Sequence, residues 1–207
     1  FRLSLKPLFV FVVICFILIL PFASSAVYQR VSDLKSSVLS ISSDAIDNIK
    51  IGSQLASEFN FLEASAQFND AFSKFSEAKN QIDGFNSDFS PLIELIPVQG
   101  EQYKSAKNLV TAASYLSAAA SDLSLAFDVF SKLDLAVLKS VDQENPATLT
   151  DIIVLGHTNL QPASEKIDLA VAALSEVEVE KLPADYQDEV SLIKEELPKI
   201  NSSLKQV

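Results

Sequence analysis

The sequence predicts an all-α protein, with an N-terminal transmembrane helix followed by an antiparallel bundle of about four to five long helices. Three observations support this fold class. An uncharged apolar window opens the chain, and apolar residues recur at helical spacing over most later segments. No segment alternates apolar and polar residues between turn signals, as strands of a sheet do.

The apolar window runs from Pro7 to Gln29, between Lys6 and Arg30. As a helix it would be roughly 34 Å long, enough to cross a bilayer core of about 30 Å. We therefore predict a membrane anchor at Pro7–Phe22, with the lipid bilayer as its partner. The anchor residues are Leu8, Phe9, Phe11, Ile14, Phe16, Ile17, Ile19 and Leu20.

The charge distribution gives the anchor a direction. Residues 1–26 contain Arg2 and Lys6 and no acid, whereas removing these two from the 16 basic residues leaves 14 against 27 acids, a net charge of about −13. The positive-inside rule then predicts a single-pass cell-membrane protein with a cytoplasmic N-terminus. Residues 1–26 form the flank and anchor, and residues 27–207 form the extracytoplasmic bundle. An acidic bundle excludes nucleic acid as a partner, because phosphate is repelled.

A cleaved signal peptide is the alternative to a retained anchor. Ser24 and Ala26 occupy the small-residue positions of a candidate cleavage site, although the apolar stretch is long for a signal. The only cysteine, Cys15, lies inside this stretch, so no intramolecular disulfide forms.

The segments after the anchor carry apolar residues at alternating steps of three and four. The first stripe begins at Val27, and we expect the membrane helix to continue outward as a stalk towards Phe59. The next segment alternates large Phe with small Ala, which suits closely packed helices. Many serines are interpreted as solubilising residues on the outer faces. The helix-seam residues, predicted to be core, are Phe61, Phe68, Phe75, Ile82, Leu109, Leu116, Leu123 and Phe130.

Turn and breaker residues predict where these helices end. Asn60 is expected to cap a turn, and Asp83-Gly84 to stop the following helix. Residues 85–100 are then predicted to be a loop, because Pro91, Pro97 and Gly100 disfavour one long helix, although Pro91 could open a short one. The apolar residues of this segment predict that the loop packs down, and a docking surface is the alternative. A long helix is expected from Glu101 to about Leu138. Another starts at Ala147 and kinks or restarts near Pro162, and a last one follows the break at Leu182-Pro183 and has Pro198 near its end.

No residue pattern indicates catalysis, a cofactor or a metal. The sole histidine, His157, has no metal ligand beside it, and Glu176, Glu178 and Glu180 do not share a helix face. Asp142, Glu144 and Asp151 lack the glycine and the final glutamate of a calcium-binding loop. The sequence has neither a phosphate-binding glycine loop nor a nucleophile elbow. We therefore expect a non-enzymatic protein.

The segment LEASAQFNDAFSKFSEA, after a helix and tight turn, resembles one hairpin of a tetratricopeptide repeat. No second copy follows at 34 residues, so a solenoid is not expected. Three helical segments follow the predicted membrane helix, in the order EASAQFNDAFSKFSEAKNQI, LIELIPVQGEQYKSAKNLVTAASYLSAA and ASEKIDLAVAALSEVEVEKLPADYQDEVSLIKEELPKI. This arrangement resembles the membrane-proximal region of a domain-of-unknown-function family of single-pass bacterial cell-surface proteins. This resemblance implies a helical region that precedes a larger extracytoplasmic domain.

These features favour an anchored helical stalk or interaction module of the cell envelope. Its partners would be a second copy or another envelope protein, bound through helix packing. Two alternatives remain. One is the sensor half of a transmembrane receptor, which needs a second apolar run of about 20 residues. The other is a secreted helical binding protein, released by signal cleavage.

Overall fold

The computed structural model describes the backbone of residues 5–93, 97–131, 147–182 and 184–205, and most side chains within 29–85, 104–131 and 158–205. The chain is all-α over these ranges, with five long helices, one short 3-10 helix and no strand. The elements are α1 (Leu5–Ser57), α2 (Phe61–Ile93), α3 (Pro97–Ser131), α5 (Ala147–Ser175), η1 (Val179–Lys181) and α6 (Ala184–Leu204).

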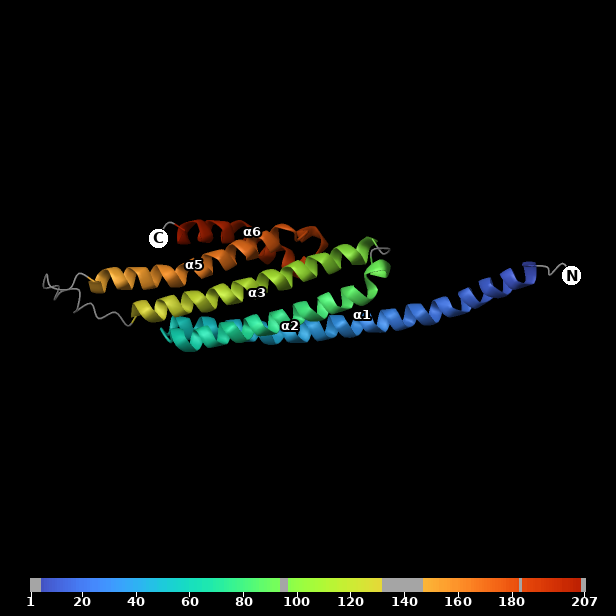
Figure 1. The fold of residues 1–207 in the computed structure, drawn as a ribbon, viewed down its shortest axis with the longest axis horizontal. Helices are drawn as coiled ribbons and strands as arrows, with labels where there is room; N and C mark the ends of the chain where they lie inside the picture. The colour runs from blue at the N-terminus through green and yellow to red at the C-terminus, as the bar shows by residue number, and fades with distance from the viewer. Residues whose placement is uncertain (1–4, 94–96, 132–146, 183, 206–207) are drawn as a thin grey trace.

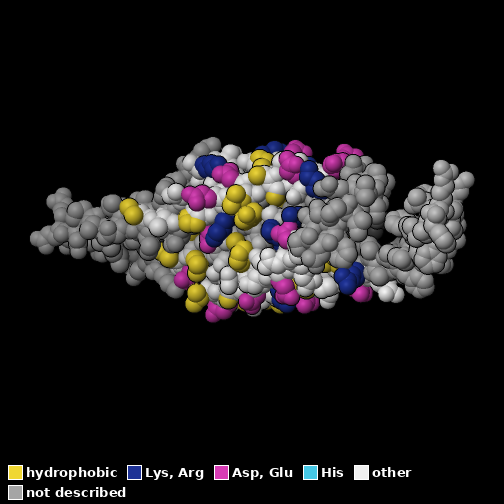
Figure 2. Space-filling model, turned by 45° about the vertical axis from the view of Figure 1, so that its right-hand side comes forward, with side chains coloured by type: hydrophobic (Ala, Val, Ile, Leu, Met, Phe, Trp, Pro, Cys, Tyr) yellow, Lys and Arg dark blue, Asp and Glu magenta, His cyan; other side chains and the backbone are white. Residues whose placement is uncertain are grey.

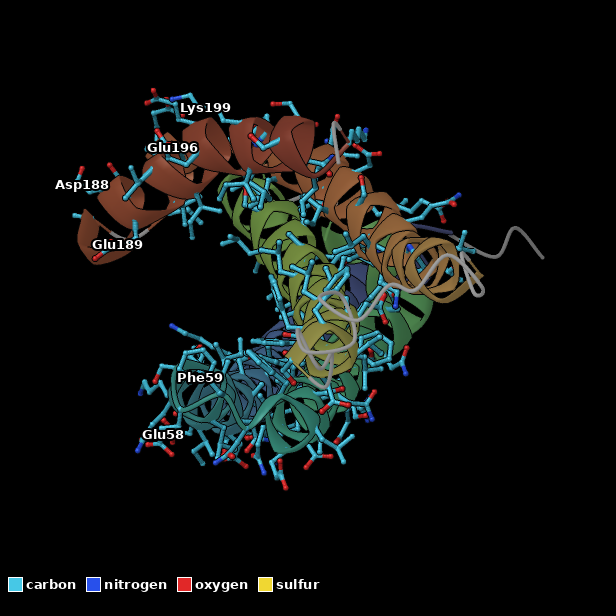
Figure 3. All side chains as sticks on the ribbon, turned by 90° about the vertical axis from the view of Figure 1, so that its left-hand side faces the viewer. Glu58, Phe59, Asp188, Glu189, Glu196 and Lys199 are labelled. Atoms are coloured by element: carbon cyan, nitrogen blue, oxygen red, sulfur yellow. The ribbon has the colours of Figure 1, made fainter. Side chains whose placement is uncertain are left out.

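The long helices pack in the order in which they occur along the chain. α2 lies between α1 and α3, α3 lies between α2 and α5, and α6 packs on α5 and η1. The molecule is elongated, with the helices nearly side by side (Figure 1). Viewed from one end, the helices follow an open arc, with α1 and α2 at one end of it and α6 at the other (Figure 3). The predicted bundle is therefore an open, sequential array.

Small residues set the spacing between these helices. Ala45, Ala71 and Ala78 are buried beside Phe75 and Ile82 between α1 and α2. A second cluster joins α3 to α5 and α6 around Ala residues and longer aliphatic side chains. Alanine lets two helix backbones approach closely, and the larger side chains then fill the space beside it. The second cluster contains Ala112, Ala119, Ala163, Ile167, Ala170, Leu174, Val177, Val190 and Leu197.

Serines are part of the interior, so their interpretation as outer-face residues is wrong for seven of them. The Ser65 hydroxyl lies 2.9 Å from that of Ser121, and the Ser76 hydroxyl lies 3.1 Å from that of Ser114. These contacts join α2 to α3 and satisfy hydroxyl groups away from water. Among the side chains that the structure describes, the seven buried serines are Ser65, Ser105, Ser114, Ser117, Ser121, Ser124 and Ser164.

Several predicted helix ends are also wrong. α2 continues through Asp83-Gly84 to Ile93, and α3 already begins at Pro97, so most of the predicted loop at residues 85–100 is helical. Gly costs only about 1 kcal/mol inside a helix, and Pro fits the first helical position without losing a hydrogen bond. Of the two alternatives at Pro162, a restart is not observed, because α5 is one helix from Ala147 to Ser175. α6 has Pro198 near its end, as expected, and ends at Leu204. The predicted end near Leu138 lies outside the described residues.

The turn at Asn60 is confirmed. The Phe59 amide donates to the Ala56 carbonyl at 3.1 Å, and the Asn60 amide donates to the Leu55 carbonyl at 2.9 Å. These are the two hydrogen bonds of a Schellman motif, in which the residue after the helix is left-handed. Phe59 holds that position with φ 64°. The turn reverses the chain so that α2 runs back along α1.

Candidate functional site

The predicted anchor lies at the start of α1, which is one helix from Leu5 to Ser57. The side chains of residues 5–28, including the anchor residues and both residues of the candidate cleavage site, are outside the described set. Among the residues that the structure describes, no helix has an apolar stretch long enough to cross a membrane. The anchor therefore stays a prediction about residues beyond that set.

The register between α1 and α2 shows where α1 leaves the array. Ser37 donates to Gln81 at 2.7 Å, and Lys74 donates to Asp44 at 3.4 Å, so the two helices run antiparallel in one constant register. Continued to the end of α2, this register places Ile93 opposite about Ser25 of α1. The part of α1 before that point extends past the other described helices (Figure 1). It contains Pro7–Phe22.

The predicted seam residues differ in burial. Phe68, Phe75 and Ile82 are buried in the α1–α2 interface. The other five, at least partly accessible to solvent, are Phe61, Leu109, Leu116, Leu123 and Phe130. α3 presents apolar residues to α2 and to α5, and the open arc leaves part of its surface uncovered.

The structure describes only some of the residues considered for chemistry. The side chain of His157 and all of Asp142 and Glu144 lie outside the described residues. Glu176 forms an exposed ion pair with Lys104 at 3.3 Å, and Glu178 and Glu180 are exposed. Within the described part of the chain, no three His, Cys, Asp or Glu side chains come together in a way that could hold a metal ion.

A shallow groove of about 270 Å³ lies where α2, α3 and α5 meet. Its polar side includes an ion pair between Lys166 and Asp122, whose charges compensate each other. The groove thus offers mainly an apolar surface with a polar edge. Its lining residues are Asn69, Phe72, Tyr115, Ala118, Ser121, Asp122, Lys166 and Leu169.

A second ionic cluster joins α2 to α3 at Asp83. Its carboxylate pairs with Lys79 at 2.7 Å and with Lys107. Partial burial raises the pKa of Asp83, but hydrogen bonds and charge from Lys107 and Lys79 outweigh burial and hold it below its ordinary value of 3.8. On α6, hydrogen bonds to Glu196 and Glu195 raise the pKa of Lys199. Both clusters are structural ion pairs, and neither adjoins a described cavity.

Aromatic side chains gather at the end of the array where α1 turns into α2. The Phe59 and Phe61 rings are 6.0 Å apart and nearly perpendicular, and the Phe61 and Phe127 rings are 5.7 Å apart. We call Phe59, Phe61 and Phe127 the distal patch. Sequence reasoning missed it, because Phe61 was assigned to the core seam. The available signal was Phe59, an aromatic residue between a helix end and its capping Asn60.

The surface elsewhere mixes charges of both signs. On the face shown in Figure 2, hydrophobic side chains lie among Lys, Arg, Asp and Glu side chains. Such a surface is ordinary for a folded domain. The two features that stand out are therefore the projecting start of α1 and the distal patch. Comparison of this chain with protein-family models, with curated proteins and with solved structures finds no match.

Proposed function

We propose that this protein is a non-enzymatic, membrane-anchored helical stalk and interaction module of the cell envelope. Residues 7–22 hold it in the bilayer with the N-terminus in the cytoplasm, and the helical array stands outside. The resemblance of its sequence segments to single-pass bacterial cell-surface proteins agrees with this proposal. In that family a larger extracytoplasmic domain follows, and the array would hold such a domain away from the membrane.

The observation that carries the proposal is where α1 leaves the array. The register with α2 ends opposite about Ser25, close to the end of the apolar segment at Phe22. The backbone of this segment extends beyond the neighbouring helices, and its sequence is apolar. Apolar surface in contact with water costs about 25 cal/mol per Å². A bilayer removes this cost, so the projecting segment suits an anchor.

The continuity of α1 supports retention of the anchor. Residues 23–26 lie inside the backbone of α1, with no break between the apolar segment and the array. An unbroken helix also transmits its orientation rigidly from the membrane to the array. From Phe22 to Ser57, α1 spans roughly 50 Å, so the α1–α2 turn would stand well clear of the bilayer surface.

Cysteine labelling in intact bacterial cells tests this topology. Cys15→Ser removes the only cysteine, and Ser4→Cys or Ser53→Cys then adds one reporter on either side of the predicted anchor. We expect a membrane-impermeant maleimide to label the Ser53→Cys protein in intact cells. The Ser4→Cys protein should react only after the membrane is permeabilised, and both proteins should stay in the membrane fraction after carbonate washing.

Two results would contradict the proposal. Protection of Ser53→Cys in intact cells would place the array in the cytoplasm. Release of the protein into the medium with an N-terminus at Val27 would show signal cleavage, which is the secreted alternative. A third measurement, sequencing of the gene downstream, separates the stalk from a receptor, because a receptor requires a second membrane helix.

A further inference from the structure

The distal patch exposes more aromatic surface than folding requires. Phe59 is 77% exposed and Phe127 is 49% exposed, although both lie beside the partly buried Phe61. Large aromatic side chains normally gain stability by burial, so exposed rings that contact one another mark an interaction surface. Leu62, which is 54% exposed, follows Phe61 at the start of α2 and adds to the apolar character of this end.

The backbone conformation of Phe59 also supports an interaction surface at this position. Its φ of 64° belongs to the left-handed region, where glycine is the usual residue at the end of a helix. A side chain there costs roughly 1–2 kcal/mol, and Phe59 offsets little of this cost because it is mostly exposed. A residue kept in a strained conformation with its ring in solvent is better explained by binding than by folding.

Charge selects the kind of partner. The residues from Ile51 to Ser73, which include the distal turn, contain Glu58, Glu63 and Asp70 but no Lys or Arg. On α3, Asp122 is paired with Lys166 and adds no net negative charge, so the acidic character of this end comes from Glu58 and Glu63. Glu58 and Glu63 are exposed on either side of the turn, and Figure 3 shows Glu58 next to Phe59. The aromatic rings are thus set in an acidic surface.

We propose that the distal patch docks a protein segment that carries Lys or Arg side chains. The cationic groups would lie over the faces of the Phe59 and Phe127 rings, and their aliphatic stems would pack against the ring edges. Glu58 and Glu63 would attract and orient the same groups. This inference goes beyond the anchoring role, because it assigns a binding surface and the chemistry of its partner. It does not depend on the topology, so either proposal can fail alone.

Peptide binding to the full chain tests the inference. The full chain is kept in a neutral detergent, dodecyl maltoside, which does not attract a cationic probe and does not require a membrane anchor. The probe is a fluorescein-labelled 12-residue peptide of alternating arginine and alanine. The control peptide has the same length and label, with glutamate in place of arginine. Fluorescence anisotropy should show saturable binding of the arginine peptide that weakens as salt rises, and no binding of the glutamate peptide.

Two pairs of variants assign the binding to the patch. Phe59→Gly with Phe127→Ala should weaken binding roughly tenfold, since each exposed cation–π contact accounts for about threefold. Leu39→Ala, at another exposed apolar position, is the matched control and should leave the affinity unchanged. Glu58→Gln with Glu63→Gln should weaken binding several-fold. Asp188→Asn with Glu189→Asn, on α6 at the other end of the arc, should change it less than twofold (Figure 3).

Three outcomes would overturn the inference. Equal losses from the two pairs of acidic variants would mean that only the net charge of the chain attracts the peptide. Unchanged binding by the Phe variant, with its fold intact by circular dichroism, would remove the aromatic contribution. Concentration-dependent self-association that Phe59→Gly abolishes, measured by sedimentation without peptide, would show that the patch binds a second copy of the chain instead.

Discussion

Phe59 has a strained backbone conformation, and its exposed side chain offsets little of the cost of that strain. Its φ of 64° is strained for phenylalanine, and its ring is largely exposed. Phe59→Gly should therefore leave the free energy of unfolding unchanged or raise it by up to about 1 kcal/mol. Urea denaturation followed by circular dichroism measures this change. Ser57→Gly, at a helical position two residues earlier, is the control and should lower stability by about 0.5 kcal/mol. A clear loss of stability in Phe59→Gly would show that the turn is unstrained.

Asp83 gives a prediction that depends on pH. The pKa of its carboxyl is lower in the folded protein than its ordinary value of 3.8. Its contribution to stability is therefore complete above that ordinary value and is lost as the pH falls through the lower, folded pKa. Asp83→Asn should reduce stability by up to about 1 kcal/mol at pH 7, a modest effect because the pair is partly solvated. The difference from the parent protein should begin to shrink as the pH falls below the ordinary value of 3.8 and should disappear below the lower, folded pKa.

Denaturant titrations at pH 7, 5 and 3 measure the effect of Asp83→Asn. Asp44→Asn is a matched control, because Asp44 also pairs with a lysine across helices but is more exposed. Its effect should be smaller at pH 7. A difference between Asp83→Asn and the parent protein that stays constant down to pH 3 would mean that the carboxylate charge contributes nothing.

At the scale of the helix pair, Gly52 allows α1 and α2 to lie in close contact. A Cβ atom at Gly52 would lie 3.0 Å from the Phe68 ring, whereas one at Gly84 would have nothing within 4 Å. Gly84→Ala should therefore stabilise the protein by about 1 kcal/mol, through helix propensity alone. Gly52→Ala should gain less or destabilise, because the buried Phe68 ring must shift. Thermal unfolding of both variants measures the contrast, and equal stabilisation by both would contradict the close contact.

The whole molecule is held together unevenly along its arc. α2 and α3 each pack between two helices, whereas α6 packs on α5 and η1 and exposes Leu192, Ile193 and Ile200. We expect α6 to open at a free energy at least about 1 kcal/mol below that of α3, because local opening exposes the least buried surface there. Hydrogen exchange under native conditions, resolved by peptide mass spectrometry, measures both helices. Equal protection of α6 and α3 would show a fully cooperative array.

A polar network fixes α6 to α5 and provides a variant for the same experiment. The buried Asn201 side chain accepts from Ser164 at 2.9 Å and donates to Asp168, which also pairs with Lys205. Asn201→Ala leaves the buried Ser164 hydroxyl without its partner and removes one hydrogen bond from Asp168, which keeps Lys205, at a cost of about 1–2 kcal/mol. The cost should appear as faster exchange in α6 alone. Faster hydrogen exchange in Asn201→Ala throughout the chain would mean that α6 stabilises the entire array.

Periodicity in the sequence was enough to predict the helices, since steps of three and four residues require a helix whatever it packs against. It identified Phe68, Phe75 and Ile82, which are buried. Turn and breaker residues predicted the turn at Asn60 correctly but failed at Gly84, where a local breaker was outweighed by the long helix on both sides. Polarity assigned serines to the surface, because a hydroxyl gives no sign in the sequence that a second serine 56 residues away will satisfy it.

The sequence by itself determined that this chain is helical, acidic beyond Arg30 and apolar at its start, because composition and spacing are local properties. Only the tertiary structure decided the order of packing, the point at which α1 leaves the array, and the exposure of Phe59 and Phe127 beside Phe61. These depend on which helix faces which, and a stripe of apolar residues has the same spacing whichever neighbour covers it. The distal patch became visible only when the arc brought α3 to the α1–α2 turn and left two of its three rings in solvent.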